Sequence, residues 1–135
     1  MRSIYVFLLA IILLLLSCDN NKEVVTERYK NGNPKKVNIY SGEKCIKEVM
    51  YHENKEKYVE INMNNNVREG EAVAWYPNGK LWSKGSYVNG KAHGKRTTWY
   101  ENGKIRYEGY YNMGKETGEW KFYDTIGKLV KTIKY

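Results

Sequence analysis

Few residues of this chain have the type and spacing that catalytic or metal chemistry needs. The 135 residues include two histidines and two cysteines. Neither His52 nor His93 belongs to a cluster of His, Cys and carboxylate residues with the spacing of a metal site. The sequence shows no Ser/His/Asp set and no obvious carboxylate pair of the kind used in glycoside chemistry. It therefore predicts a protein that is not an enzyme, with no catalytic residues, no metal, no cofactor and no evident small-molecule substrate.

One segment imitates a phosphate-binding loop. Residues 85–91 fit the first seven positions of that motif, but the eighth is Ala92 where a Ser or Thr must hold Mg²⁺. The same pattern recurs at residues 109–115. A pattern that recurs in this way is better interpreted as the turn residues of repeated β-hairpins than as a nucleotide site.

Cys18 is the one residue for which the sequence predicts a chemical modification. Arg2 gives a short positive start, and residues 4–16 are 13 apolar or aromatic residues without a charge. A spanning helix needs about 20 such residues, so the run favours a cleaved, helical signal peptide over residues 1–17. The following Leu15-Leu16-Ser17-Cys18 resembles the bacterial lipobox. This resemblance implies that Cys18 is the lipid attachment site, that residues 18–24 are a short tether, and that the protein is a membrane-anchored lipoprotein of the bacterial cell envelope. The choice between inner and outer membrane stays open.

The charge of the chain allows two interpretations. The formal net charge is +8, and it falls by one when Arg2 leaves with the signal peptide. Lysines on exposed strands protect sheet edges from pairing, and they also attract anionic lipid or acidic polysaccharide. Export disfavours nucleic acid as a partner. Cys45 has no partner for an intramolecular disulfide once Cys18 is lipidated, so we expect it to be a small apolar residue on a strand.

An internal repeat of 24 residues organises the rest of the chain. Glycines recur at this spacing, as do lysines, aliphatic residues and tyrosines. The columns are Gly70/Gly94/Gly118, Gly79/Gly103/Gly127, Lys80/Lys104/Lys128, Leu81/Ile105/Leu129 and Tyr87/Tyr111/Tyr135. The pattern is clear over residues 70–135 and degenerate over 25–69. Such a period indicates an array in which each repeat stabilises its neighbours.

The residues within each repeat predict β-hairpins. Asn-Gly pairs stand between runs rich in β-forming residues, which is typical of a two-residue type I′ turn. About ten strands are expected, with no helix after the leader. For Asn78-Gly79, a two-residue turn pairs Tyr76 with Leu81 and Trp75 with Trp82, and it places Trp82 on the same face as Trp75. The predicted fold class is all-β, an elongated antiparallel hairpin meander in a single layer.

Residues 70–80 and 94–104 carry a family resemblance. Gly-Glu-Ala-Val-Ala-Trp-Tyr-Pro-Asn-Gly-Lys and Gly-Lys-Arg-Thr-Thr-Trp-Tyr-Glu-Asn-Gly-Lys resemble the bacterial variant of the MORN repeat, found in the YwqK-type antitoxin family. The resemblance implies a β-hairpin array over residues 25–135 and brings no catalytic residues with it.

These features favour a binding or scaffolding protein with an unidentified protein partner. Trp75, Trp99 and Trp120 lie on successive repeats, and Trp75 and Trp99 share one register. With Lys80, Lys104 and Lys128 as a charged rim they form the candidate interaction surface. Two alternatives stay open, namely an antitoxin or immunity-type partner that neutralises a toxin, and a binder of anionic membrane lipid or polysaccharide.

Overall fold

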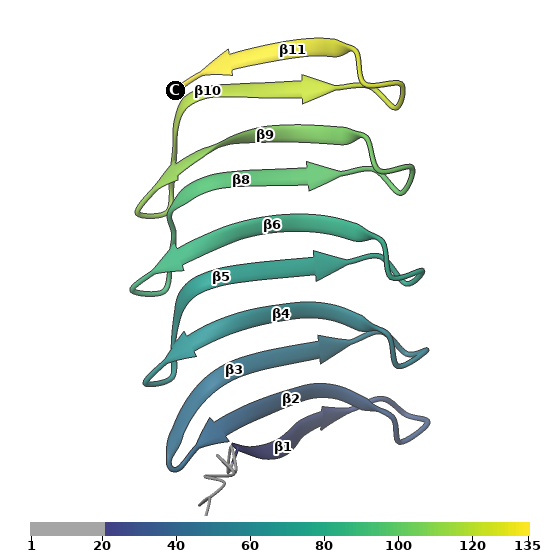
Figure 1. Cartoon of the computed structure of the whole chain (residues 1–135), viewed down its shortest axis with the longest axis vertical. Coiled ribbons are helices and arrows are strands. Elements are labelled where there is room, and N and C mark those ends of the chain that lie inside the picture. Colours follow the sequence, from purple (N-terminus) through teal and green to yellow (C-terminus); the bar gives the residue numbers. More distant parts are fainter. Residues whose placement is uncertain (1–20) are drawn as a thin grey trace, which may run out of the picture.

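Eleven β-strands follow one another along residues 21–135, the part of the chain that the computed structural model describes (Figure 1). Their bounds are β1 (Asn21–Arg28), β2 (Pro34–Ser41), β3 (Lys44–Tyr51), β4 (Lys57–Asn64), β5 (Val67–Trp75), β6 (Leu81–Val88), β7 (Lys91–Ala92), β8 (Gly94–Trp99), β9 (Ile105–Asn112), β10 (Lys115–Tyr123) and β11 (Leu129–Lys134). Neighbours in sequence pair antiparallel in one sheet, except that β8 pairs β6 and the short β7 also lies on β6. The predicted all-β hairpin meander is confirmed.

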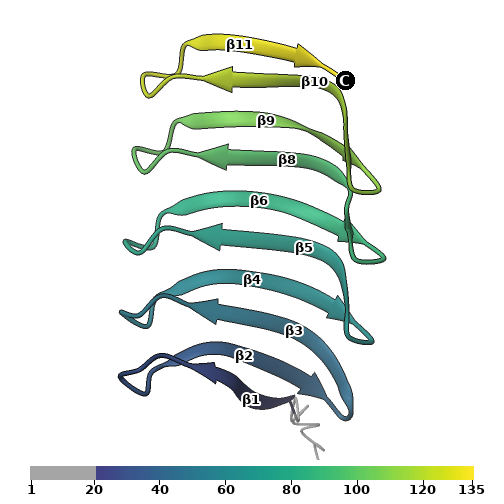
Figure 2. The ribbon, with the colours of Figure 1, turned by 180° about the vertical axis from the view of Figure 1, so that it is seen from behind.

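The sheet is a single layer. Figures 1 and 2 show its two sides, and no described element covers either of them. Buried apolar residues are correspondingly few among the described residues: Val37, Cys45, Val49, Ile61, Ala72, Ala74 and Trp120. Cys45 is buried on β3, as expected from the sequence. Residues 21–135 contain no helix, hence none that is long and apolar enough to cross a membrane.

The predictions for the N-terminal segment concern residues at or beyond the edge of the described part of the chain. The signal peptide (1–17) and Cys18 fall outside them. Strand β1 begins at Asn21, so four residues of the expected tether 18–24 already pair with β2.

The turns differ between the two edges of the ribbon. On the edge at the left of Figure 1, two residues connect the paired strands, as at Asn89-Gly90 between Val88 and Lys91. Asn89 and Gly90 both have positive φ, 49° and 77°, which is the type I′ geometry expected of an Asn-Gly turn. Met113-Gly114 and Asn65-Asn66 repeat this geometry without the Asn-Gly sequence.

The opposite edge has three-residue loops, and here the predicted type I′ turns are wrong. Gly79 N donates to Tyr76 O at 2.9 Å, and Tyr76 N donates to Lys80 O at 2.9 Å. Only Gly79 has positive φ (78°), so residues 77–79 form a type I turn followed by a left-handed residue with a bulge. Asn78 therefore serves another purpose: its Oδ1 accepts a hydrogen bond from Lys80 N at 3.0 Å. Asn102-Gly103 has the same arrangement.

The bulge changes the predicted pairing and the face of one tryptophan. Trp75 pairs with Leu81 and Ala74 with Ser83, so Trp82 is the extra residue. Its indole stacks on Tyr58, with ring centroids 5.9 Å apart. Trp82 thus lines the face that carries Ala74, and not the face of Trp75 as predicted.

Hydrogen bonds between successive repeats tie the three-residue loops together. Tyr76 Oη donates to Trp99 O at 2.8 Å, and Tyr100 Oη donates to Tyr123 O at 2.9 Å. His52 occupies the equivalent place one repeat earlier, with Nε2 2.9 Å from Trp75 O. The phenol and imidazole groups therefore fix the spacing of the hairpins along this edge.

Candidate binding surfaces

Alternation along the strands gives the sheet two different faces. Face A carries Ala72, Ala74, Thr98 and Trp120, and face B carries Trp75, Trp99 and most of the ion pairs between strands. The register of the strands fixes this division, since paired residues point to the same face. Ala74 pairs with Ser83, which pairs with Thr98, and these three lie on face A. Val73 pairs with Lys84, which pairs with Thr97, and these three lie on face B.

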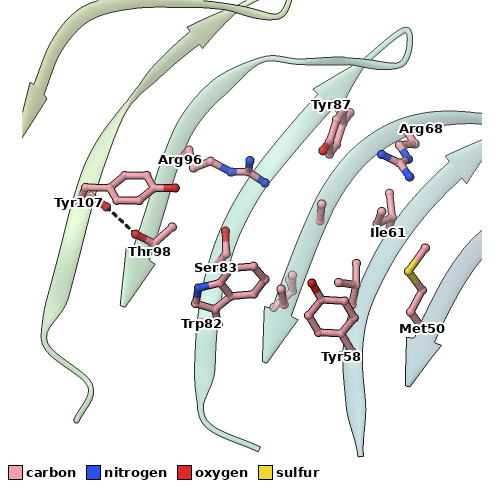
Figure 3. Close-up of a pocket in the computed structure, with 14 residues that line it drawn as sticks. Met50, Tyr58, Ile61, Arg68, Trp82, Ser83, Tyr87, Arg96, Thr98 and Tyr107 are labelled. Atoms are coloured by element: carbon pink, nitrogen blue, oxygen red, sulfur yellow. Dashed lines mark hydrogen bonds between the residues drawn. The ribbon is translucent and has the colours of Figure 1, made fainter. Parts of the chain in front are cut away.

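Face A is hollowed by a groove of about 290 Å³ that crosses β4, β5, β6 and β8 (Figure 3). Its floor is apolar, with Ile61, Ala72 and Ala74 each less than a tenth exposed. The rings of Tyr58 and Trp82 stand at one end, nearly parallel at 12°. The other walls carry aromatic, basic and hydroxyl side chains, namely Arg68, Tyr87, Arg96, Tyr107, Ser83 and Thr98.

Differences between repeats explain why the groove is at this place. The column of Trp120 contains Arg96 one repeat earlier and Ala72 two repeats earlier. The column of Phe122 contains Thr98 and then Ala74. Trp120 is only 2% exposed and packs over Gly109, so the last repeat is filled by its own aromatic side chains. Ile61 stands where the later repeats have Gly85 and Gly109, so it fills part of the equivalent space, and the two alanines leave the rest of it open.

The charge of the groove comes from two arginines on opposite sides of its floor. Arg68 lies 5.6 Å from the Tyr87 ring centroid, and its Nη2 is 3.4 Å from Glu48 Oε1. Glu48 is buried and also accepts from Lys36 Nζ at 2.7 Å, so it is shared between two cations. Arg96 extends over Gly85 and forms no ion pair within residues 21–135.

Face B carries several ion pairs, including Lys84–Glu71 and Lys95–Glu108. Lys95 Nζ lies 2.7 Å from Glu108 Oε2, and Tyr123 Oη donates to Glu108 Oε1 at 3.1 Å. The hydrogen bond from Lys95, with a smaller one from Tyr123, lowers the pKa of Glu108 despite its partial burial. These contacts stabilise the ionised carboxylate of Glu108.

The structure brings together some of the predicted interaction residues. Lys80, Leu81 and Trp99 line one shallow depression beside the loops, about 330 Å³ in volume. One repeat later, Lys104 and Tyr123 line an equivalent depression of about 350 Å³. Trp75 lies in the same register as Trp99, and Lys57 Nζ is 6.0 Å from its ring centroid.

Lys128 continues this row at the last loop, where Asp124 N donates to its carbonyl oxygen as Tyr100 N does to Lys104 O, whereas Trp120 lies apart from it. Trp120 is on face A, in contact with Tyr107, Tyr111, Phe122 and Tyr135, and its burial leaves no ring surface for a partner. Lys128 follows the last loop, where its N–H donates to Asp124 Oδ1 at 2.8 Å. Among the described residues no group of three His, Cys, Asp or Glu side chains has the geometry of a metal site.

The array of 24-residue hairpins defines a class of β-repeat protein, and comparison with known families agrees. The family model described as "MORN repeat variant" matches the chain twice, at residues 68–89 and 92–113. The two matches are offset by one period of the repeat. No curated protein matches the chain in the comparison with individual sequences.

Sequence reasoning missed the groove and its two arginines. The repeat was identified from the columns that stay constant, whereas the groove lies where columns vary. Aligning the columns of Trp120 and Phe122 across repeats would have shown the replacement by Ala72 and Ala74. The position of Trp82 could not be found in this way, because it depends on the loop type.

Proposed function

We propose that this chain is a lipid-anchored, non-catalytic protein of the bacterial cell envelope, whose sheet is a protein-interaction or scaffolding surface. The observation that carries this proposal is the groove on face A, where aromatic and basic side chains surround an apolar floor without a covering layer. MORN repeats are in general non-catalytic modules that contact proteins or lipids. Aromatic and arginine side chains are the residue types that contribute most to binding at protein interfaces.

Anchoring at Cys18 would hold the sheet close to the membrane. Three residues of chain reach at most about 11 Å when fully extended, and three residue steps separate Cys18 from the first residue of β1. The β1 edge of the ribbon would then face the lipid, and the later repeats would project away from it. The groove, formed by β4 to β8, would be accessible to a partner in the envelope.

A specific observation also favours contact with anionic membrane lipid or polysaccharide. Lys80 and Lys104 line depressions at the same edge of the ribbon, beside Trp99 and Tyr123. Repeated lysines at one edge present positive charge to an extended anionic surface. The resemblance to the YwqK-type antitoxin family keeps toxin neutralisation as a further form of the protein-binding proposal.

Crosslinking in intact bacteria tests the proposed function. The full chain with a C-terminal tag is expressed, crosslinked in the cell and recovered from the membrane fraction. We expect to recover one or a few envelope proteins in stoichiometric amounts. The Cys18→Ser variant should be released from the membrane fraction and should not incorporate a labelled fatty acid. Unchanged detergent partitioning of Cys18→Ser would contradict the anchor, and recovery of the chain alone would contradict the interaction surface.

Trp99→Tyr tests the candidate surface on face B. This change keeps a β-forming aromatic residue while it removes the indole. Loss of the crosslinked partner with an intact fold would support a role of this surface in binding. A drop in stability with normal crosslinking would assign Trp99 to the sheet alone.

A further inference from the structure

We infer that the groove over Ala72 and Ala74 receives an aromatic side chain from an acidic segment of the protein partner. This inference rests on the proposed function, and it specifies the chemistry of the contact. It follows from the way in which the last repeat fills the same place with its own side chains.

Trp120 shows how face A binds an aromatic ring. Its indole lies over Gly109, with ring centroids 5.8 Å from Tyr107 and 5.1 Å from Tyr111. The indole Nε1 donates to Tyr110 O at 3.2 Å, so the polar edge of the ring is also satisfied. Aromatic pairs at these distances stabilise the cluster beyond the burial of their surface.

The groove has part of this environment without the ring, and Ile61 replaces Gly109 as its floor. Ala72 stands in the column of Trp120, and the stacked Tyr58 and Trp82 border the hollow together with Tyr87. At about 290 Å³ the groove lies near the lower limit of ligand pockets, which suits one large side chain better than a drug-sized molecule. A ring inserted there would cover the floor that Ile61 and the two alanines provide.

The two arginines determine the charge of the segment that carries the ring. Arg96 has no ion-pair partner in the described part of the chain, and Arg68 shares Glu48 with Lys36. Each guanidinium has five N–H donors and can bind a carboxylate with two of them. Carboxylates on both sides of the aromatic residue would therefore meet one arginine each.

The lining also argues for a protein segment over a neutral sugar. None of its 14 side chains is an Asp, Glu, Asn or Gln. Sugar hydroxyls bring many donors that need acceptors, and each polar group left unsatisfied in a buried contact weakens binding. The side chains of an acidic aromatic segment bring few donors, since an aromatic ring has at most one and the flanking carboxylates have only acceptors.

Peptide binding to the full chain in detergent tests this inference by fluorescence anisotropy. The probe is a labelled peptide Glu-Glu-Trp-Glu-Glu, compared with Glu-Glu-Ala-Glu-Glu and Lys-Lys-Trp-Lys-Lys. We expect the first to bind at least tenfold more tightly than the other two. Arg96→Gln should weaken it at least fivefold, and Ala72→Trp should abolish binding because the new indole fills the groove. Lys84→Gln removes a charge from face B of the neighbouring strand and should leave the affinity unchanged.

Several results would overturn the inference. These are equal affinities for the Trp and Ala peptides, unchanged binding by Arg96→Gln, or an equal effect of Lys84→Gln. Competition by anionic vesicles or by an oligogalacturonate at lower concentration than the free peptide would assign the groove to lipid or to glycan. If circular dichroism shows that Ala72→Trp has lost its β-sheet, the inference is tested by Arg96→Gln and by the comparison of the three peptides. If the groove variants still crosslink to the same partner in the cell, this inference is wrong but the proposed function stands. If the unchanged protein crosslinks to no partner, the proposed function is wrong.

Discussion

Gly109→Ala tests whether the aromatic cluster around Trp120 holds the last repeats in place. A Cβ atom at Gly109 would overlap the indole of Trp120, which is almost completely buried. The indole cannot move away without losing its contacts with Tyr107, Tyr111 and Phe122. Gly109 does not have a positive φ, so the effect of the substitution comes from the clash and not from backbone strain.

The magnitude follows from the burial of the ring. Overpacking of a core costs about 1–3 kcal/mol, and complete loss of a buried Trp side chain about 3–5 kcal/mol. Alanine recovers about 0.5–1 kcal/mol relative to glycine within a strand. We therefore expect Gly109→Ala to destabilise the sheet by about 2–4 kcal/mol.

Gly85→Ala is the matched control because Gly85 occupies the same column one repeat earlier. Its nearest neighbour would be Arg96 Nε at 3.2 Å, on a long side chain that can shift. The change should alter stability by less than about 0.5 kcal/mol, since the small contact penalty and the better strand propensity of alanine oppose each other.

Urea denaturation of the full-length variants, followed by tryptophan fluorescence and near-ultraviolet circular dichroism, measures both effects. Fluorescence reports all four tryptophans, so a local loss at β9 to β11 appears as a first transition at low urea. Similar midpoints for the two variants would refute the reasoning. In Gly109→Ala/Trp120→Leu the clash is removed, so the loss should be smaller than the sum of the two single losses.

Three further predictions concern the loops and the ion pairs. Lys55 has φ of 71° where later repeats have glycine, so Lys55→Gly should raise the free energy of unfolding by roughly 0.5–1 kcal/mol, measured by urea denaturation. A decrease in stability would contradict the left-handed conformation of Lys55. Gly103→Val places a β-branched residue at φ of 82° and should cost about 1–3 kcal/mol by the same assay, and a change near zero would be incompatible with this loop. The hydrogen bond from Lys95 lowers the pKa of Glu108 below its ordinary value of 4.5, so its stabilising contribution is present above that pH and disappears as the pH falls below it. Thermal melts between pH 7 and pH 3 should show a smaller loss for Glu108→Gln than for the unchanged protein, and parallel curves would contradict this assignment.

Much of the fold was predictable because the repeat leaves little freedom. A period of 24 residues with two turns in each repeat specifies two strands per repeat, and consecutive strands joined by short turns must pair antiparallel. The strands β5 to β11 lie where the columns of Gly79 and Gly90 place them. The degenerate repeats before residue 70 also form paired strands, and His52 replaces tyrosine there without loss of the hydrogen bond to the next repeat.

The turn type was not predictable from Asn-Gly alone. The same dipeptide forms a two-residue turn at Asn89-Gly90 and the end of a three-residue loop at Asn78-Gly79. In the loop, the asparagine is retained for its side chain, which caps Lys80 N, and only the glycine needs a positive φ. One residue of difference in loop length moved Trp82 to the other face of the sheet, and with it one wall of the groove.

Constant and variable columns of the repeat have different physical roles. The constant columns, such as the loop glycines and the Tyr76/Tyr100 pair, set the spacing between hairpins, and a change in any of them disturbs the array. The column of Ala72, Arg96 and Trp120 varies in size and charge, yet each of the three residues pairs with the residue 13 positions later on the following strand. Because stability in such an array is close to a sum over neighbouring repeats, the buried cluster around Trp120 can offset the contacts that Ala72 does not make. A hollow of defined shape can therefore persist in the middle of a single-layer sheet, and this is the physical reason to look for binding where the repeat is least regular.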